Sequence, residues 1–232
     1  MKTREIVILA NSRKHDGHCI AGKDIATGEW IRPIKGIGSG QVFTAHPTFQ
    51  DEDFQSLGLD ASGPQLLDCI RMGFGNDCPL PYQPENKFID GKTWEKTGKF
   101  SPHRIPELID RTEPAFFREF IPAKELVATP PTASLNFLRL TSRSNNVEII
   151  HLTKHRKYPQ HRLKFYHGSK RYDLAITDFH YENLVAQSLN DDSRIIEDFY
   201  LTIGLGENFT PSGTTLVWHY HFIVGIIPSY QL

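Results

Sequence analysis

Short apolar runs and two-residue alternation dominate the pattern of hydrophobic and polar positions along this chain. Residues 5–10 form the first apolar run, and 18–23 and 28–34 follow as two alternating segments around the turn-forming residues 24–28. Segments of this length, separated by a short loop that ends in Gly, are typical of two strands joined in a hairpin. We therefore expect the chain to open with three short β-strands.

The second half of the chain repeats this style without repeating the sequence. We expect strands at residues 135–141, 147–152, 162–166, 171–176, 200–205 and 215–227. Helix is favoured at only two places, residues 106–120, where Phe116, Phe117 and Phe120 supply an apolar stripe, and residues 178–187. The pattern therefore predicts a mainly β protein with a few short helices.

The Pro130-Pro131 pair stops any regular element, and we place the domain boundary there. The predicted first domain covers residues 1–125 and carries a helical insertion near 106–120. A Pro-containing linker follows at 121–133, and the second domain covers 133–232. Each half offers about five strands with one or two short helices, which is the content of a small five-stranded β-barrel.

The amino-acid composition also bears on where in the cell the protein is found. Hydrophobic residues make up 39% and charged residues 23% of the 232 residues, and the longest apolar runs are too short to span a bilayer. Only five apolar residues follow the basic start, which does not resemble a signal peptide. Cys19, Cys69 and Cys78 lack the spacing of a disulfide framework. We expect a soluble cytoplasmic protein that does not bind membranes.

Charge is unevenly distributed. Residues 151–172 contain seven Lys or Arg and no Asp or Glu, whereas the other 210 residues hold 19 basic and 27 acidic side chains. Aromatic residues are interleaved with these cations, and this mixture suits phosphates and unstacked bases. The predicted nucleic-acid-binding residues of this basic run are Lys154, Arg156, Lys157, Arg162, Lys164, Tyr166, Lys170 and Arg171. A solvated basic surface without a ligand is the alternative.

Strand alternation divides part of the basic run between two faces. On a strand over residues 162–166, Arg162, Lys164 and Tyr166 share one face, while Leu163 and Phe165 share the other. We therefore expect Phe165 in the core and the cations on the surface.

A second candidate site lies in the opening hairpin. Arg13, Lys14, His15 and Arg32 can surround one end of a barrel and bind phosphate, with Trp30 as a stacking surface. The alternative is that Trp30 belongs to the core and Arg32 pairs locally. A catalytic alternative uses His15 or His18 to move a proton beside Lys14, although spacing fixes no carboxylate or nucleophile next to either.

The last long strand raises the question of a metal site. His219 and His221 would lie on one face of this strand, and His180 or a carboxylate would have to complete a zinc site. Because the sequence locates no third ligand, we expect neither metal nor cofactor. Trp218, Tyr220 and Phe222 would then occupy the opposite face, which we expect to be core.

Two stretches carry a resemblance to a known family. "ILANSRKHDGHCIAGKDIATGEWIRPI" at residues 8–34 contains Lys, four residues, then Cys-Ile-Ala-Gly, followed by Thr-Gly-x-Trp-Ile-Arg-Pro. This pattern resembles the N-terminal signature of the bacterial dual OB-fold domain family, and "YLTIGLGENF" at residues 200–209 is similar to the way the family ends. The resemblance implies two tandem OB-like barrels. It also implies a nucleic-acid-binding role in prokaryotic conflict and defence systems, with no established reaction to carry over.

These observations together favour a non-catalytic recognition protein for single-stranded or modified nucleic acid, serving a prokaryotic defence or nucleic-acid modification system. A protein partner from the same operon would supply any enzymatic step. Two alternatives remain open. One is an enzyme acting on nucleic acid or a nucleotide through Lys14, His15 and His18, and the other is a protein-interaction module.

Overall fold

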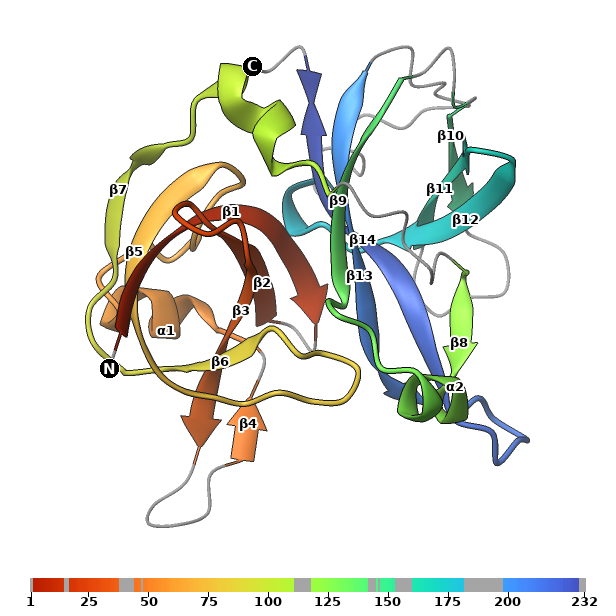
Figure 1. Ribbon diagram of the computed structural model, residues 1–232, viewed down its shortest axis with the longest axis horizontal. Helices are drawn as coiled ribbons and strands as arrows, with labels where there is room; N and C mark the ends of the chain where they lie inside the picture. The colour runs from red at the N-terminus through yellow and green to blue at the C-terminus, as the bar shows by residue number, and fades with distance from the viewer. Residues whose placement is uncertain are drawn as a thin grey trace. The chain divides into compact units, whose positions relative to one another are not determined.

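The computed structural model describes residues 2–14, 17–37, 44–46, 48–110, 118–141, 145, 147–152, 160–181 and 198–229. Within these residues strands predominate, as the sequence pattern predicts (Figure 1). Contacts divide the chain into two compact units, one of residues 1–108 with 132–134 and one of residues 109–131 with 135–232. No helix among these ranges combines the length and the apolar character that crossing a membrane requires.

The first unit contains a closed five-stranded barrel. Its strands are β1 (Lys2–Lys14), β2 (Gly17–Asp24), β3 (Trp30–Ile37), β5 (Asp68–Asp77) and β6 (Asn86–Ile89). They follow the order β1-β2-β3-β6-β5, and β5 pairs back onto β1 to close the ring. The β3–β6 pair is parallel and the other pairs are antiparallel.

Closure depends on the length and curvature of β1. Residues Lys2–Val7 pair with β5, while Ile6–Lys14 pair with β2, and the register shifts between Ile8 and Ala10. Gly22 of β2 passes so close to β1 that a Cβ there would lie 2.1 Å from the carbonyl oxygen of Val7. The glycine is therefore required by this close approach of two backbones.

Smaller elements complete the first unit. β4 (Thr44–His46) pairs with β3, and β7 (Glu95–Lys99) pairs with β5. The helix α1 (Asp51–Ser56) follows β4, and a 3₁₀ helix η1 covers Pro102–Leu108. The barrel core is one cluster of buried side chains: Ile6, Ile8, Ile20, Ile31, Phe49, Phe54, Leu57, Ile70, Met72, Phe74 and Trp94.

The second unit repeats this strand order. Its sheet runs β10 (Glu148–Leu152), β11 (Gln160–His167), β12 (Lys170–Ile176), β14 (Trp218–Pro228), β13 (Phe199–Phe209) and β9 (Leu135–Leu140). The β12–β14 pair is parallel, like β3–β6 of the first unit. β9 pairs with β13 and β10 pairs with β11. Two consecutive strands thus share the pairings that the single long β1 makes in the first unit.

Each unit therefore has the strand order of an OB-like barrel, in which strands 2 and 3 form a hairpin and strand 5 lies parallel to strand 3. In the second unit β11 and β12 take the places of strands 2 and 3, and β13 and β14 those of strands 4 and 5. Its core is a separate cluster that includes Leu138, Leu163, Phe165, Leu174, Leu201 and Ile223.

The segment between the barrels differs from the sequence expectation. The predicted helical insertion near 106–120 is represented by η1, which ends at Leu108, and residues 111–117 lie outside the described residues. The predicted linker 121–133 contains most of β8 (Phe120–Pro122) and all of α2 (Ala123–Ala128). β8 pairs with β14, and residues up to 131 belong to the second unit, whereas 132 and 133 belong to the first. The main boundary between the units by contacts falls after residue 108.

Candidate nucleic-acid interface

The β11–β12 hairpin of the second unit presents one apolar and one basic face. Leu163, Phe165, Tyr172 and Leu174 point inward and are buried, and the rings of Phe165 and Tyr172 stack at 5.1 Å. Gly168 supplies the left-handed turn residue at φ +59°. The prediction that Phe165 belongs to the core is confirmed.

The opposite side of this hairpin carries the cations. Tyr166 lies opposite Arg171 in the register, and both are exposed, as is Lys170 beside the turn. Lys164 lies opposite Asp173, with its ammonium 3.9 Å from the carboxylate, a separation at the limit of an ion pair. We call Lys164, Tyr166 and Arg171 the basic face. Lys170 pairs with His167 in the register, so strand alternation places it on the side of Tyr172, at the exposed end of the hairpin.

Arg162 shares this strand side but is not available to a ligand. It is 8% exposed, its Nε donates to Asp173 at 2.5 Å, and its Nη2 donates to Glu119 at 2.5 Å. Two carboxylates thus neutralise the guanidinium, which joins β11 and β12 to the residue before β8. Its predicted role as a phosphate ligand does not fit this placement, because a buried and fully paired guanidinium cannot turn toward a phosphate without breaking both ion pairs.

Beside Glu119 lies a surface group of four aromatic rings, which we call the aromatic cluster: Phe120 of β8, Phe209 of β13, and Trp218 and Tyr220 of β14. The Phe120 ring lies 4.8 Å from Trp218 and 5.9 Å from Tyr220, and the Phe209 ring lies 5.7 Å from Tyr220. Phe120 is 43% exposed and Phe209 54% exposed, although aromatic side chains usually bury most of their area. Exposed Leu216 and Val217 directly precede Trp218. Exposed aromatic and aliphatic side chains thus gather at one end of β13 and β14, which makes this surface a candidate interaction site.

The aromatic cluster corrects the face assignment made from sequence. Trp218, Tyr220 and Phe222 were expected in the core, but they are only partly buried, whereas His219 and His221 are 1% and 5% exposed. The imidazoles tolerate burial because each Nδ1 donates to a backbone carbonyl, that of Gly206 for His219 and that of Arg118 for His221. The alternation of residue types separates the two faces of β14 correctly, but it does not show which of the two faces is buried in the second unit.

The two histidines of β14 are held by backbone carbonyls rather than directed at a shared point. Desolvation by burial lowers the pKa of His221 to about 4, against the opposing effect of its hydrogen bond to the Arg118 carbonyl. His180 is exposed, and its backbone N–H donates to Asp178. Within the described ranges no three His, Cys, Asp or Glu side chains gather in a way that could hold a metal ion.

In the first unit, the predicted stacking residue Trp30 and the predicted phosphate ligand Arg32 are both buried. Trp30 is 8% exposed, and the Lys23 ammonium lies 5.1 Å from its ring centre. Arg32 is 6% exposed and its Nη2 lies 3.0 Å from Glu85 and donates to the Ser134 hydroxyl at 2.9 Å. These are the contacts of a core aromatic and a structural ion pair, so neither residue is carried forward as a binding residue. Arg13 is exposed and Lys14 partly so.

His18, the catalytic alternative, is a buried structural histidine. Its Nδ1 bonds to the Asn11 side chain at 2.9 Å, its Nε2 lies 3.6 Å from the exposed Asp51, and burial lowers its pKa. The neighbouring Ser12 hydroxyl donates to the Cys19 carbonyl. His18 is therefore held in place by the Asn11 side chain, by Asp51 and by the edge-on contact of its ring with Phe54 at 5.2 Å.

Four predicted site residues lie outside the described residues: His15, Lys154, Arg156 and Lys157. The last three belong to the connection between β10 and β11, which corresponds to the loop between strands 1 and 2 of an OB fold. OB folds bind oligonucleotides on the face of strands 2 and 3 and through the loops between strands 1 and 2 and strands 4 and 5. The sequence-predicted basic run therefore coincides with that loop and those strands, and the aromatic cluster flanks the strand 4–5 loop.

Strand order and surface chemistry thus define a protein of two OB-like units. A family model described as a dual OB-containing domain matches residues 4–226, and the chain belongs to this family. Comparisons with curated proteins and with solved structures gave no match.

Proposed function

We propose that this chain binds single-stranded nucleic acid through its second unit. The observation that carries the proposal is that the second unit presents both the basic face and the aromatic cluster. The ion pair between Arg162 of β11 and Glu119, the residue before Phe120, links the backbone segments that carry them. Proteins that bind single strands combine cations along the backbone with aromatic rings on which bases stack. Here the basic face lies on β11 and β12, which correspond to strands 2 and 3, and the aromatic cluster lies beside the strand 4–5 loop, and OB folds use both regions.

The ligand we propose is single-stranded because stacking on the aromatic cluster needs unpaired bases. Base pairs in a duplex already stack on each other, and their flat faces are not available to a protein side chain. Phe120 and Phe209 are the most exposed rings of the cluster. They are also the rings most accessible to a base.

A recognition role in a prokaryotic defence or nucleic-acid modification system is the finer form of this proposal, and a cytoplasmic location goes with it. What supports the recognition part is that His18, the histidine of the catalytic alternative, is buried and bonded to the Asn11 side chain. In that role a modified base is a candidate target, and a partner chain supplies the chemistry.

Fluorescence anisotropy tests the proposal with labelled 12-residue DNA and RNA, single-stranded and duplex, with and without base modification, at two salt concentrations. We expect single strands to bind more tightly than duplexes of the same sequence, and all binding to weaken as salt rises. If no DNA or RNA binds at low salt, the proposal is wrong. A protein-interaction role for the aromatic cluster then becomes the leading hypothesis.

A further inference from the structure

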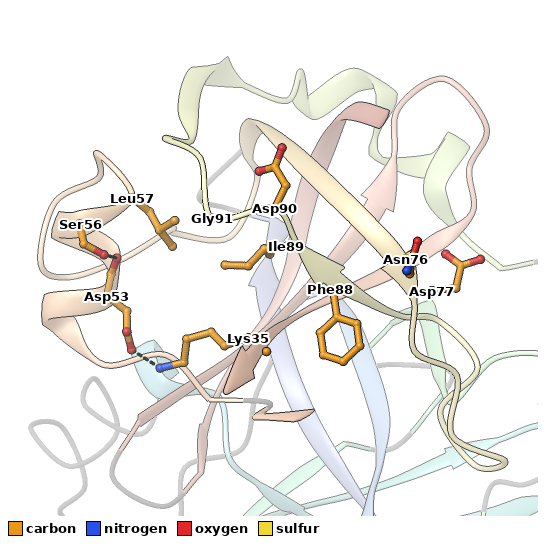
Figure 2. A pocket seen from close by; sticks show the side chains of 11 residues that line it. Lys35, Asp53, Ser56, Leu57, Asn76, Asp77, Phe88, Ile89, Asp90 and Gly91 are labelled. Atoms are coloured by element: carbon orange, nitrogen blue, oxygen red, sulfur yellow. Dashed lines mark hydrogen bonds and ion pairs between the residues drawn. The ribbon is translucent and has the colours of Figure 1, made fainter. Parts of the chain in front are cut away.

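The first unit contains a pocket that the proposed strand-binding surface does not use. Its volume is about 660 Å³, and every residue that lines it belongs to the first unit. Pockets of roughly 300–1,000 Å³ are typical of small-molecule and cofactor sites. The walls are the end of β3, the C-terminal part of α1, the end of β5, and β6 with the two residues that follow it (Figure 2).

The floor of this pocket is apolar. Figure 2 shows the Phe88 and Ile89 side chains between the α1 residues on one side and Asn76 with Asp77 on the other. Leu57 closes the α1 side, and it and Ile89 also pack against the barrel core. Phe88 is partly buried and offers an aromatic side chain at the centre of the pocket.

The charged side chains around the pocket balance each other. Asp53 pairs with Lys35 at 2.5 Å and Asp77 pairs with Lys87 at 2.5 Å. The third carboxylate, Asp90, has the Lys92 ammonium 3.9 Å away. Three carboxylates therefore face three ammonium groups, and a neutral ligand fits this arrangement better than an anion or a cation does.

Polar groups remain at the pocket to bind such a ligand. Lys35 and the Gln50 N–H both use Oδ2 of Asp53, and Lys87 uses Oδ1 of Asp77, so the other oxygen of each carboxylate can accept a hydrogen bond. As far as the described residues go, no protein group bonds to the exposed side-chain amide of Asn76. An amide that donates and accepts side by side matches the edge of a base, and carboxylates accept from base amino groups.

We propose that this pocket binds one nucleobase, as a free nucleoside or as a base within a strand. Phe88 supplies the stacking surface, Asn76 pairs with the base edge, and Asp53 or Asp77 accepts from an amino or ring N–H. Nucleosides are preferred over their 5′-monophosphates wherever the phosphate would approach these carboxylates. The proposal stands apart from single-strand binding by the second unit, since the pocket and the basic face are in different units.

Saturation-transfer NMR on the intact protein tests the pocket with adenosine, guanosine, cytidine, uridine and thymidine, each beside its 5′-monophosphate. A second arm titrates single-stranded ten-residue homopolymers. We expect at least one nucleoside or homopolymer to lose about tenfold in affinity in the Asn76→Ala variant, because the two hydrogen bonds from the amide to the base edge are lost. Phe88→Leu weakens the same ligand by removing the aromatic surface.

Gln55→Ala is the matched control, because it removes an exposed amide from α1 outside the pocket lining. It should leave the affinity unchanged, and thermal melting checks that all three variants fold. Nucleoside binding that depends on Asn76 identifies a free base as the ligand, and dependence seen only with a homopolymer identifies a base in a strand. If no ligand in either arm depends on Asn76 or Phe88, the proposal is overturned. The Lys164→Ala/Arg171→Ala double variant removes two cations of the basic face in the second unit and should leave nucleoside binding unchanged. A failure of the pocket proposal can therefore be distinguished from a failure of strand binding by the second unit.

Discussion

Two arginines of one hairpin have opposite surroundings. Arg171 is exposed on the basic face, whereas Arg162 is held by Asp173 and Glu119 and is 8% exposed. Their positions in the sequence run are equivalent, since both are cations in the acid-free segment 151–172. The difference lies in the neighbouring carboxylates. Asp173 of β12 and Glu119, the residue before β8, pair with Arg162 and give it a structural role, whereas Arg171 remains exposed and can bind phosphate.

The exposed cations should contribute to the salt dependence of binding. The change is Lys164→Ala with Arg171→Ala. Each phosphate contact on a single strand contributes a slope of about −0.7 in log K against log salt, so we expect this variant to flatten the slope by about 1.4. Anisotropy titrations at four salt concentrations measure it. Arg104→Ala, which removes an exposed arginine from the first unit, is the control and should leave the slope unchanged. An unaltered slope in the double variant would contradict the assignment of the basic face.

The aromatic cluster should contribute affinity without salt dependence. For Phe120→Ala we expect binding to weaken by about 1–3 kcal/mol if a base stacks on this ring, with the salt slope unchanged. Because Phe120 is 43% exposed, its loss should have a small effect on stability compared with a buried ring. The comparison variant is Val127→Ala, at an apolar position of α2 that is 73% exposed. Equal binding by Phe120→Ala and wild type would remove the aromatic cluster from the interface.

His221 predicts an acid-sensitive fold. Its pKa is lowered from 6.5 to about 4 by burial, so the unfolded chain binds a proton that the folded chain excludes between these values. The free energy of unfolding should therefore fall as pH decreases from about 6.5 to 4, by on the order of 3 kcal/mol from this group. Burial of His18 acts in the same direction.

Urea unfolding at pH 7.5, 6.0 and 5.0 measures this effect. His221→Asn keeps a side-chain donor for the Arg118 carbonyl but cannot titrate, so its stability should depend less steeply on pH than that of wild type. His180→Asn, at an exposed position, controls for the loss of an imidazole elsewhere. Parallel pH profiles for wild type and His221→Asn would contradict the prediction.

At the scale of elements, Arg162 fastens the β11–β12 hairpin to the start of β8. Its partners Asp173 and Glu119 have side chains 38% and 44% exposed, so water moderates the cost of losing the cation. We expect Arg162→Met to lower the free energy of unfolding by about 1–2 kcal/mol, less than for a fully buried pair. The salt slope of nucleic-acid binding should stay at the wild-type value, because Arg162 does not contact phosphate. A slope flattened by about 0.7 would instead restore its sequence-predicted role.

Strands were predictable where one face is consistently apolar. β11 alternates Leu163 and Phe165 with cations, and the structure buries the first two and exposes the tip of the hairpin as expected. β14 alternates aromatic residues with histidines, and both sets can be buried. What decided its faces was a carbonyl from Arg118, 103 residues earlier in the chain, which no local pattern contains.

The candidate site was predictable as a segment and not as a set of side chains. The acid-free run located the hairpin and its exposed cations because net charge is a property of a local stretch. The burial of Trp30 and Arg32 was not predictable from their own segment, because their partners Lys23, Glu85 and Ser134 come from other elements. The aromatic cluster was missed for the same reason, since β8, β13 and β14 bring its rings together only in the folded sheet.

At the scale of the whole molecule, two separate cores predict two separable unfolding events. The clusters around Ile70 and Leu163 share no residue. We expect differential scanning calorimetry to depart from a two-state transition, because multi-domain proteins commonly do so. Ile70→Ala and Leu163→Ala each remove a fully buried side chain and should each destabilise one unit by about 2–5 kcal/mol. If both variants shift a single transition equally, the units unfold as one.

The central place of β14 sets the order in which the two barrels can form during synthesis. β14 pairs with β8, β12 and β13, so these three strands lack a shared partner strand until residue 228 has been synthesised. The first ring uses no strand beyond Ile89 and can close while the ribosome is still translating the rest. At a synthesis rate of about 5–20 residues per second, β8 and its exposed phenylalanine wait on the order of ten seconds for their partner strand. In that interval the nascent chain leaves the edges of β12 and β13 without their partner strand.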